Sequence, residues 1–368
     1  MPDTLIVHDF FDIRGGGERL VLEMANGLNA AGAENTLMTG WRSEASFDAA
    51  QFPRKIIEIG YPKYLQLRGL RTILLSWHFT RFTSQVARYP VRIFSGICAI
   101  FSAPKKQPGA RNIFYCHTPP RFLYDQYRFH IDRLPLKKRL LFVPVLAVYR
   151  FFYERYVARM DVIVANSVNI QRRIKTYLGR ESVVVYPPCD TDHFTWLGQG
   201  DYYLSTARHA PLKRVEVIAE AFRRMPDKKL IIASSGEDAE KVKRAAAGAP
   251  NIHFSGWTNE AEMLRLMGNA IATVYIPIEE DFGMSPVESM SAGKPVIGVA
   301  EGGMLETVID GKTGYLVPEG AAVQDVMNAV QKLTPEAALA MRSACEARAA
   351  EFSTARFIDG MRAVLASA

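Results

Sequence analysis

Three glutamates and an aspartate lie in the sequence EEDFGMSPVE, residues 279–288, where they could form a catalytic pair, a sugar-binding loop or an acidic turn before a capped helix. Glu288 follows Ser285 at the three-residue spacing of a capping box, with a proline at the expected first helical position. We therefore expect Ser285 to cap a helix together with Glu288, an interaction worth about 1 kcal/mol. A cap gives no reason for Glu280 or for the Phe-Gly turn that follows it.

Basic side chains occur in a second stretch, TARHAPLKR, residues 206–214. We expect Arg208 to end a strand and Lys213 to open the next helix. A guanidinium fork and an ammonium at one edge of a sheet would suit a diphosphate. Lys213 could instead lie on a solvated face, whereas Arg208 is harder to explain in that way because strand ends in a parallel sheet are mostly covered.

Two further candidates follow predicted strands. RGGGERL, residues 14–20, places Gly16 and Gly17 before a helix whose free N–H groups could bind phosphate, although a plain tight turn is equally compatible. The stretch lacks the G-x-G-x-x-G spacing and the P-loop lysine, and no acid ends the second strand. His117 ends another strand before two prolines; a lone histidine is more often structural, but this position favours a function.

Short apolar runs rich in Val and Ile alternate with helical patterns along the chain, which indicates βαβ units with parallel sheets covered on both faces. The pattern restarts after Pro187-Pro188, which cannot continue a strand ladder. The sequence therefore predicts an α/β protein with two doubly wound, Rossmann-like domains facing across a cleft, with ligands at the carboxyl ends of the strands. The expected domains are residues 1–187 and 188–352, with a C-terminal helix at 353–368 that packs back on the first domain.

The composition is that of a globular protein: 368 residues, 48% hydrophobic and 23% charged, with a formal net charge of +7. That charge favours anionic partners, although a solvated basic surface would explain it as well. The four cysteines show no CxxC spacing and indicate neither a zinc site nor a disulfide framework, so a reducing compartment fits. We expect no signal peptide and no membrane-spanning run.

Two stretches, residues 65–82 and 133–159, mix basic residues with aliphatic and aromatic ones. Such a mixture can lie in an anionic membrane interface. It can equally belong to long core helices with a basic exposed edge, and the sequence leaves both interpretations open.

The stretch E-x-F-G-x-x-x-x-E, from Glu280 to Glu288, resembles the two-glutamate signature of retaining GT-B glycosyltransferases of the GT4 group. GGGERL, RHAPLKR and EGGMLETVIDGKTGYLV resemble that group's glycine loop, diphosphate clamp and closing segment, so the resemblance covers nearly the whole chain. YCHTPPRFLYDQY and SGWTNEAEM further resemble bacterial mannosyltransferases of lipopolysaccharide and exopolysaccharide assembly. That resemblance implies GDP-mannose as donor, a polyprenyl-diphosphate-linked saccharide as acceptor, and a cytoplasmic enzyme at the inner membrane surface.

The resemblance also implies a role for each candidate residue. Glu280 would bind hydroxyls of the donor sugar, Glu288 the ribose, and His117 would lie at the reacting sugar. The phosphates would bind Arg208, Lys213 and the amides of Gly16 and Gly17. Backbone contacts to the donor would come from Phe282, Gly283, Met284 and Ser285. Glu260 would bind guanine.

Neither glutamate has an obvious acid partner in the sequence, so we expect front-face transfer rather than a glycosidase-like double displacement. No metal-binding motif is evident, and we expect an activity without metal or cofactor. Three alternatives stay open: a UDP-sugar donor in the same fold, a GT-B sugar-nucleotide epimerase, and a binding protein without activity. The basic residues form no known nucleic-acid reader motif.

Overall fold

The computed structural model describes residues 3–12, 15–43, 47–60 and 70–367. Contacts divide the chain into two compact units: Met1–Tyr186 with Phe357–Ala368, and Pro187–Arg356. The boundary between the two units lies after Tyr186, one residue before the predicted domain boundary after residue 187. The chain returns to the first unit at Phe357, within the last helix, rather than at residue 353.

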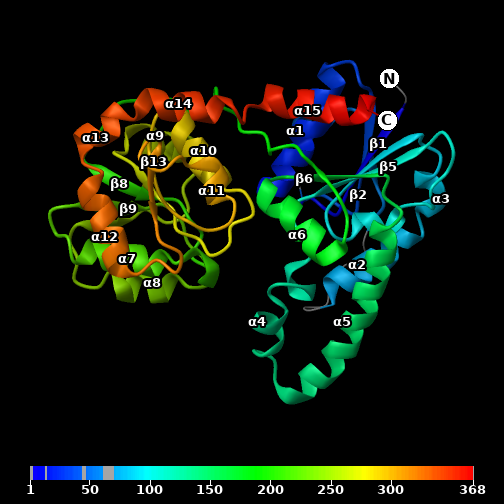
Figure 1. Ribbon diagram of the computed structural model, residues 1–368, viewed down its shortest axis with the longest axis horizontal. Coiled ribbons are helices and arrows are strands. Elements are labelled where there is room, and N and C mark those ends of the chain that lie inside the picture. The colour runs from blue at the N-terminus through cyan, green and yellow to red at the C-terminus, as the bar shows by residue number, and fades with distance from the viewer. Residues whose placement is uncertain (1–2, 13–14, 44–46, 61–69, 368) are drawn as a thin grey trace. The chain divides into compact units, whose positions relative to one another are not determined.

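Within the described residues, the first unit holds a seven-stranded parallel sheet in the order β3-β2-β1-β4-β5-β6-β7 (Figure 1). The strands are β1 Thr4–His8, β2 Asn35–Thr39, β3 Ile56–Glu58, β4 Val91–Ser95, β5 Arg111–Cys116, β6 Val162–Ala165 and β7 Val183–Val184. The helices are α1 Gly16–Ala30, α2 Arg71–Thr80, α3 Thr83–Val86, α4 Tyr127–Ile131, α5 Leu136–Val157, α6 Val168–Leu178 and α15 Thr354–Ala366, with short 3₁₀ turns at η1 Ala49–Gln51, η3 Ala99–Ser102 and η4 Arg121–Leu123.

The described residues of the second unit repeat this arrangement with a six-stranded parallel sheet in the order β10-β9-β8-β11-β12-β13. The strands are β8 Tyr202–Ser205, β9 Lys229–Ile232, β10 Ile252–Phe254, β11 Thr273–Val274, β12 Val296–Val299 and β13 Gly314–Val317. The helices are α7 Val215–Arg223, α8 Ala239–Ala245, α9 Glu260–Asn269, α10 Met284–Ser291, α11 Met304–Thr307, α12 Val323–Lys332, α13 Pro335–Ala340 and α14 Arg342–Ala350, with the 3₁₀ turn η5 at Pro211–Lys213.

The interior strand β1 shows why the first sheet needs helices on both faces. Successive side chains of a strand point to opposite faces, and here Leu5 and Val7 join one apolar core while Ile6 joins the other. All five residues of β1 are buried. The two parallel sheets confirm the prediction of two doubly wound domains. Strands that are apolar on both faces are buried when helices cover both faces of the sheet.

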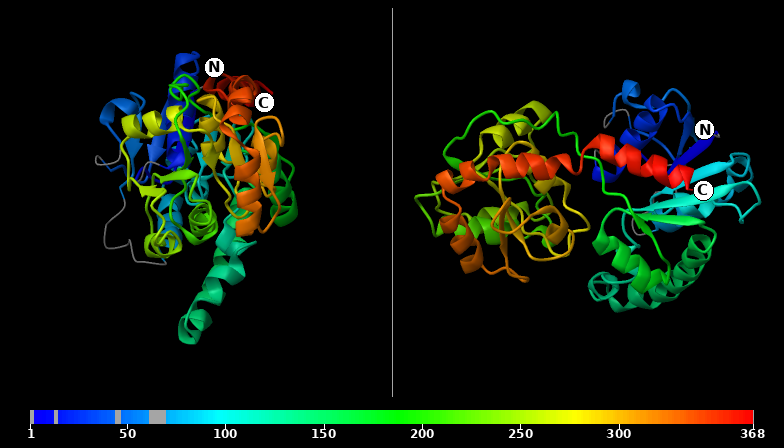
Figure 2. Two further views of the ribbon diagram at one scale, coloured as in Figure 1. Left: turned by 90° about the vertical axis from the view of Figure 1, so that its left-hand side faces the viewer. Right: turned by 45° about the horizontal axis from the view of Figure 1, so that its top comes forward.

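The last helix, α15, packs beside α1 in the first unit (Figures 1 and 2). Ile358 of α15 lies against Gly27 of α1, where an added Cβ would come within 2.4 Å of Ile358 Cδ1. A glycine in the middle of a helix normally destabilises it. The absence of a side chain at Gly27 therefore leaves the space that Ile358 occupies.

Helix α5 is basic and apolar at once, as the sequence predicted for this stretch. Tyr149, Tyr153 and Val157 are its buried residues, and all lie in its C-terminal half. The N-terminal half extends away from the sheet (Figures 1 and 2). Among the residues that the structure describes, no helix is both long and apolar enough to cross a membrane. Residues 65–69 of the other predicted stretch lie outside the described part of the chain.

Candidate functional site

His117 follows β5 directly, and its ring lies between the end of β4 and the N-terminus of α1. Its Nε2 is 2.7 Å from Oγ of Ser95, the last residue of β4. Three ring atoms lie 3.7 to 3.9 Å from the position that a Cβ of Gly17 would take. Burial lowers the pKa of His117 to about 4, so the imidazole is neutral at neutral pH. The fold thus brings His117 to Gly17, two residues that the sequence predicted separately.

Two groups at the end of β1 were missed by the sequence reasoning. Nδ1 of His8 donates to the carbonyl oxygen of Ser95 at 3.1 Å, and burial together with the nearby His117 lowers the pKa of His8 to about 3. The Asp9 carboxylate accepts hydrogen bonds from the consecutive N–H groups of residues 97–99. Burial nevertheless raises the pKa of Asp9 to about 6. The only sequence signal for this pair was its position at the end of the first strand.

Gly16 and Gly17 are the first residues of α1, with Gly15 as the N-cap. The first N–H groups of a helix have no partner within it and carry a partial positive charge. The predicted glycine turn is therefore part of a helix N-terminus, as a phosphate site requires. Binding of phosphate by these amides stays a prediction.

In the second unit, Lys213 and Glu280 lie in direct contact. Nζ of Lys213 is 2.6 Å from Oε2 of Glu280 and 2.9 Å from the hydroxyl of Tyr275. Burial opposes the charged ammonium, but Tyr275 and Glu280 outweigh it, and the pKa of Lys213 is raised. Lys213 ends η5 rather than opening α7, which begins at Val215. A cation and a carboxylate from loops after neighbouring strands therefore meet at the carboxyl edge of this sheet.

The predicted capping box of Ser285 and Glu288 is wrong. Helix α10 begins at Met284, and its N-cap is Gly283, which has a φ of 96° and makes no side-chain cap. Glycine adopts this left-handed conformation without steric cost, so the helix starts before Ser285 and places that residue in its first turn. Glu288 lies farther along the helix and is half-buried. A purely structural role as a cap no longer accounts for it.

Phe282 is buried beneath this loop, with its ring centroid 5.3 Å from that of Phe352. The backbone of the loop is held from the other side, because the N–H of Gly303 donates to the carbonyl oxygen of Glu280 at 2.8 Å. The Phe-Gly turn thus anchors the segment that carries Glu280. This explains the spacing of Glu280, Phe282 and Gly283 in structural terms.

The structure places Arg208 differently from expectation, and it gives Glu260 a partner that the sequence did not indicate. Arg208 was expected to end a covered strand, but β8 ends at Ser205 and Arg208 is exposed in the following loop. Among the described side chains, no hydrogen bond or ion pair joins it to Lys213 or Glu280. Glu260 is the first residue of α9, and its Oε1 is 2.9 Å from Nε2 of His193. A guanine would have to compete with His193 for that carboxylate, and both donor-binding roles stay predictions.

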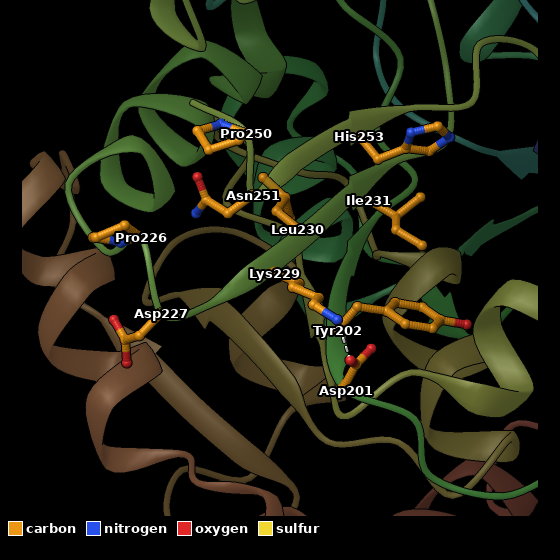
Figure 3. A pocket seen from close by; sticks show the side chains of 10 residues that line it. All are labelled: Asp201, Tyr202, Pro226, Asp227, Lys229, Leu230, Ile231, Pro250, Asn251 and His253. Atoms are coloured by element: carbon orange, nitrogen blue, oxygen red, sulfur yellow. Dashed lines mark hydrogen bonds and ion pairs between the residues drawn. The ribbon is translucent and has the colours of Figure 1, made fainter. Parts of the chain in front are cut away.

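A hollow of about 430 Å³ lies at the opposite edge of the second sheet (Figure 3). Its lining includes Tyr202 and Lys229, the first residues of β8 and β9. It also includes residues around the start of β10, namely Pro250, Asn251 and His253. Ligands of doubly wound sheets bind at the carboxyl ends of the strands. The hollow is at their amino ends and is therefore distinct from the Lys213–Glu280 site.

Two family models match the chain one after the other. Residues 14–193 match Glycosyltransferase Family 4, and residues 190–351 match Glycosyl transferases group 1. The alpha-1,3/1,6-mannosyltransferase ALG2 of Dictyostelium discoideum is 27% identical over 382 aligned residues, which cover 87% of this chain and 86% of that protein. A D-inositol 3-phosphate glycosyltransferase of Geodermatophilus obscurus is 28% identical over 58% of this chain and 54% of its own length.

Solved structures share the fold at low sequence identity. A sucrose-phosphate synthase from Thermosynechococcus elongatus has a TM-score of 0.76 at 17% identity, and the alignment covers 100% of each chain. The lipopolysaccharide outer core galactosyltransferase WaaB has a TM-score of 0.73 at 16% identity, with 99% of each chain covered. Because the two family models match consecutive parts of the chain and both units hold parallel sheets, the chain belongs to the GT4 group of GT-B glycosyltransferases and is a retaining hexosyltransferase.

Proposed function

We propose that the protein is an α-mannosyltransferase that moves mannose from GDP-mannose to a polyprenyl-diphosphate-linked saccharide. The observation that carries the proposal is the 2.6 Å contact between Lys213 and Glu280, because these side chains would bind adjacent groups of one nucleotide-sugar donor. Mannose as the sugar is supported by the alpha-1,3/1,6-mannosyltransferase that is similar over 87% of the chain. Bacterial surface polysaccharide assembly, the setting we propose, rests on the sequence resemblance.

The residues of the site fit the demands of the reaction. The bond between the anomeric carbon and the donor phosphate oxygen breaks, and the acceptor hydroxyl oxygen bonds to that carbon from the same face. The acceptor proton goes to the departing phosphate oxygen, so the chain needs no separate base. In the second unit, Lys213 would stabilise the charge that grows on the diphosphate, and Glu280 would hold hydroxyls of the sugar.

We also propose that α5 attaches the enzyme to the anionic cytoplasmic face of the inner membrane, where a lipid-linked acceptor would be found. Exposed apolar side chains along the helix could enter the interface, and the exposed cations of its first turns could bind lipid phosphates. The apolar ones are Leu136, Leu140, Leu141, Val143, Val148 and Phe151, and the basic ones include Lys137, Lys138 and Arg139.

Metal-independent transfer is part of the proposal, because Lys213 and helix N–H groups can neutralise the departing diphosphate. Among residues 3–12, 15–43, 47–60 and 70–367, no group of three or more His, Cys, Asp and Glu side chains could hold a metal ion. Full activity after chelation with EDTA is expected. A strict requirement for Mg²⁺ or Mn²⁺ would contradict this part of the proposal.

The test has two stages. Thermal unfolding with GDP, UDP and ADP identifies the base, since a ligand at 100 times its Kd adds about 2.7 kcal/mol of stability. Radiolabelled transfer from GDP-mannose into a bacterial lipid extract, with mass analysis, then identifies the product. We expect GDP to stabilise most and Glu280→Gln to lower kcat about 100-fold, while the flanking Asp281→Asn retains most activity. Stabilisation by UDP alone, or unchanged transfer by Glu280→Gln, would overturn the proposal.

A further inference from the structure

Two residues of the second unit have an unusual backbone. Among the described residues, Arg214, with a φ of 51°, and Glu279, with a φ of 49°, are the non-glycine residues in the left-handed region. Residues other than glycine seldom adopt this conformation, and those that do are concentrated at functional sites. Arg214 directly follows Lys213, and Glu279 directly precedes Glu280. Each strained residue is thus the neighbour of one member of the proposed donor site.

Both strained residues bind the same buried carboxylate, that of Glu301. Its Oε1 accepts from Nη2 of Arg214 at 2.8 Å and from the N–H of Gly320 at 2.9 Å. Its Oε2 accepts from the N–H of Glu279 at 3.1 Å. Burial opposes the charged carboxylate, but these hydrogen bonds outweigh it and lower the pKa of Glu301. Glu301 therefore stays ionised and links both loops to one point.

The guanidinium of Arg214 also holds the chain that leads to Glu280. Its Nε donates to the carbonyl oxygen of Ile276 at 2.7 Å, and its Nη2 donates to that of Pro277 at 3.0 Å. These carbonyls lie between β11 and the Glu280 loop. The planar fork of arginine suits this set of acceptors, which a lysine could not reach together.

The two residues after Glu301 press against the same loop. A Cβ on Gly302 would lie 2.4 Å from the carbonyl oxygen of Glu280, and one on Gly303 would lie 2.4 Å from Cα of Phe282. Only glycine permits this approach of two backbones. The segment that begins with Glu301 is thus fitted closely to the loop that carries the proposed sugar-binding carboxylate.

We infer that Glu301 and Arg214 are positioning residues that fix the positions of Lys213 and Glu280 relative to each other, so that the ammonium binds the donor diphosphate while the carboxylate binds the sugar. The inference rests on the proposed function and adds the pair that couples its two binding groups. The ion pair keeps both strained loops in place, because each loop is bonded to the same side chain. Removing either partner leaves the other charge buried and unpaired.

The test compares Glu301→Gln and Arg214→Lys with Val330→Ala, a control that creates a cavity at a buried residue on α12 of the same unit. Affinities for GDP and GMP are measured by calorimetry, kcat by transfer from GDP-mannose, and stability by thermal unfolding. For both positioning variants we expect the preference for GDP over GMP to fall about tenfold, because the diphosphate loses a fixed cation. We also expect kcat to fall and hydrogen exchange to rise in residues 211–215 and 276–282 together.

The control is expected to lower the unfolding temperature while leaving the GDP-to-GMP preference and kcat unchanged. The inference is overturned if the positioning variants behave like Val330→Ala, or if only one of the two loops gains hydrogen exchange. Arg214→Lys retains the charge, so it provides the decisive comparison should Glu301→Gln fail to fold. A wild-type protein that binds neither GDP nor any other nucleoside diphosphate would overturn the proposed function and this inference with it. Normal donor binding with unaffected variants would overturn the inference alone.

Discussion

At the scale of single residues, the protonation state of His117 limits its role in transfer. The imidazole bonds to Ser95 through Nε2 and lies against the α1 N-terminus, an environment that disfavours a positive charge. With a pKa of about 4, it can donate or accept a hydrogen bond at neutral pH but cannot serve as a cation for the departing phosphate. Lys213, whose pKa is raised, can serve as that cation.

The pKa of His117 predicts a pH dependence of stability. The pKa is about 4 in the folded protein against the ordinary histidine value of 6.5, so the unfolded chain binds more protons between these two pH values. The contribution of the neutral His117 to the free energy of unfolding is fully present above pH 6.5 and is lost as the pH falls towards 4. We expect the unfolding temperature of His117→Gln to fall less between pH 7 and pH 5 than that of the wild type, measured by calorimetry.

The exposed His253 provides the matched control for this experiment. His253→Gln should follow the wild-type curve over the whole range. Parallel curves for the wild type and His117→Gln would show that His117 titrates as in the unfolded chain and would contradict the prediction.

The candidate residues could be predicted from the sequence where a short spacing carried the information. Lys213, Glu280 and the Phe-Gly turn are local patterns, and their positions after strands follow from the alternation of strands and helices. Glu301 and Arg214 are 87 positions apart, and their contact depends on the packing of β12 beside β11. No local pattern could indicate that pair, and the exposure of Arg208 depended in the same way on where β8 stops pairing.

At the scale of elements, helix ends were harder to predict than helices. The sequence predicted a helix directly after Gly16 and Gly17, close to the observed start of α1 at Gly16. At α10, however, the backbone freedom of Gly283 decided the start of the helix and overrode the side-chain pattern of Ser285 and Glu288. A capping box is one of several ways to start a helix, and the sequence alone did not distinguish between them.

The approach of α15 to α1 gives a prediction at this scale. Gly27→Ala improves helix propensity by about 1 kcal/mol, yet its Cβ would lie 2.4 Å from Ile358 Cδ1 and 2.6 Å from Cγ1. We expect a net loss of about 1 to 2 kcal/mol of stability from overpacking, measured by denaturant unfolding. In an Ile358→Ala background, where the clash is absent, the same substitution should stabilise the protein.

Gly17→Ala is the control for that cycle, since it is the same change in the same helix and its Cβ would make only ordinary contacts, at 3.7 Å or more, with His117. Its effect on stability should be small. If Gly27→Ala had the same effect in both backgrounds, the close approach of α15 would not be the reason for glycine at this position.

At the scale of the whole molecule, the fold class followed from the sequence because it depends on a pattern repeated many times. Each continuous apolar strand followed by an amphipathic helix indicates another βαβ unit, so single errors at element ends do not change the result. The division near Pro187 was also marked locally, by two consecutive prolines. A C-terminal helix that packs back on the first domain was expected from residue 353. No local signal marked the return at Phe357, which is fixed by the burial of α15 residues in that unit's core.

The net charge of +7 could attract the whole molecule to anionic membranes without any dedicated surface. The proposed role of α5 therefore needs a test that separates attraction by overall charge from binding through this helix. We expect the triple variant K137E, K138E and R139E to bind vesicles containing phosphatidylglycerol about 100-fold more weakly, at about 1 kcal/mol per basic residue near the surface, and to show less dependence on salt. The control K241E, K243E and R244E on α8 changes the net charge by the same amount and should retain wild-type binding. Sedimentation with vesicles measures both. If the two variants lost binding equally, the attraction would come from overall charge, and α5 would not be the membrane-binding element.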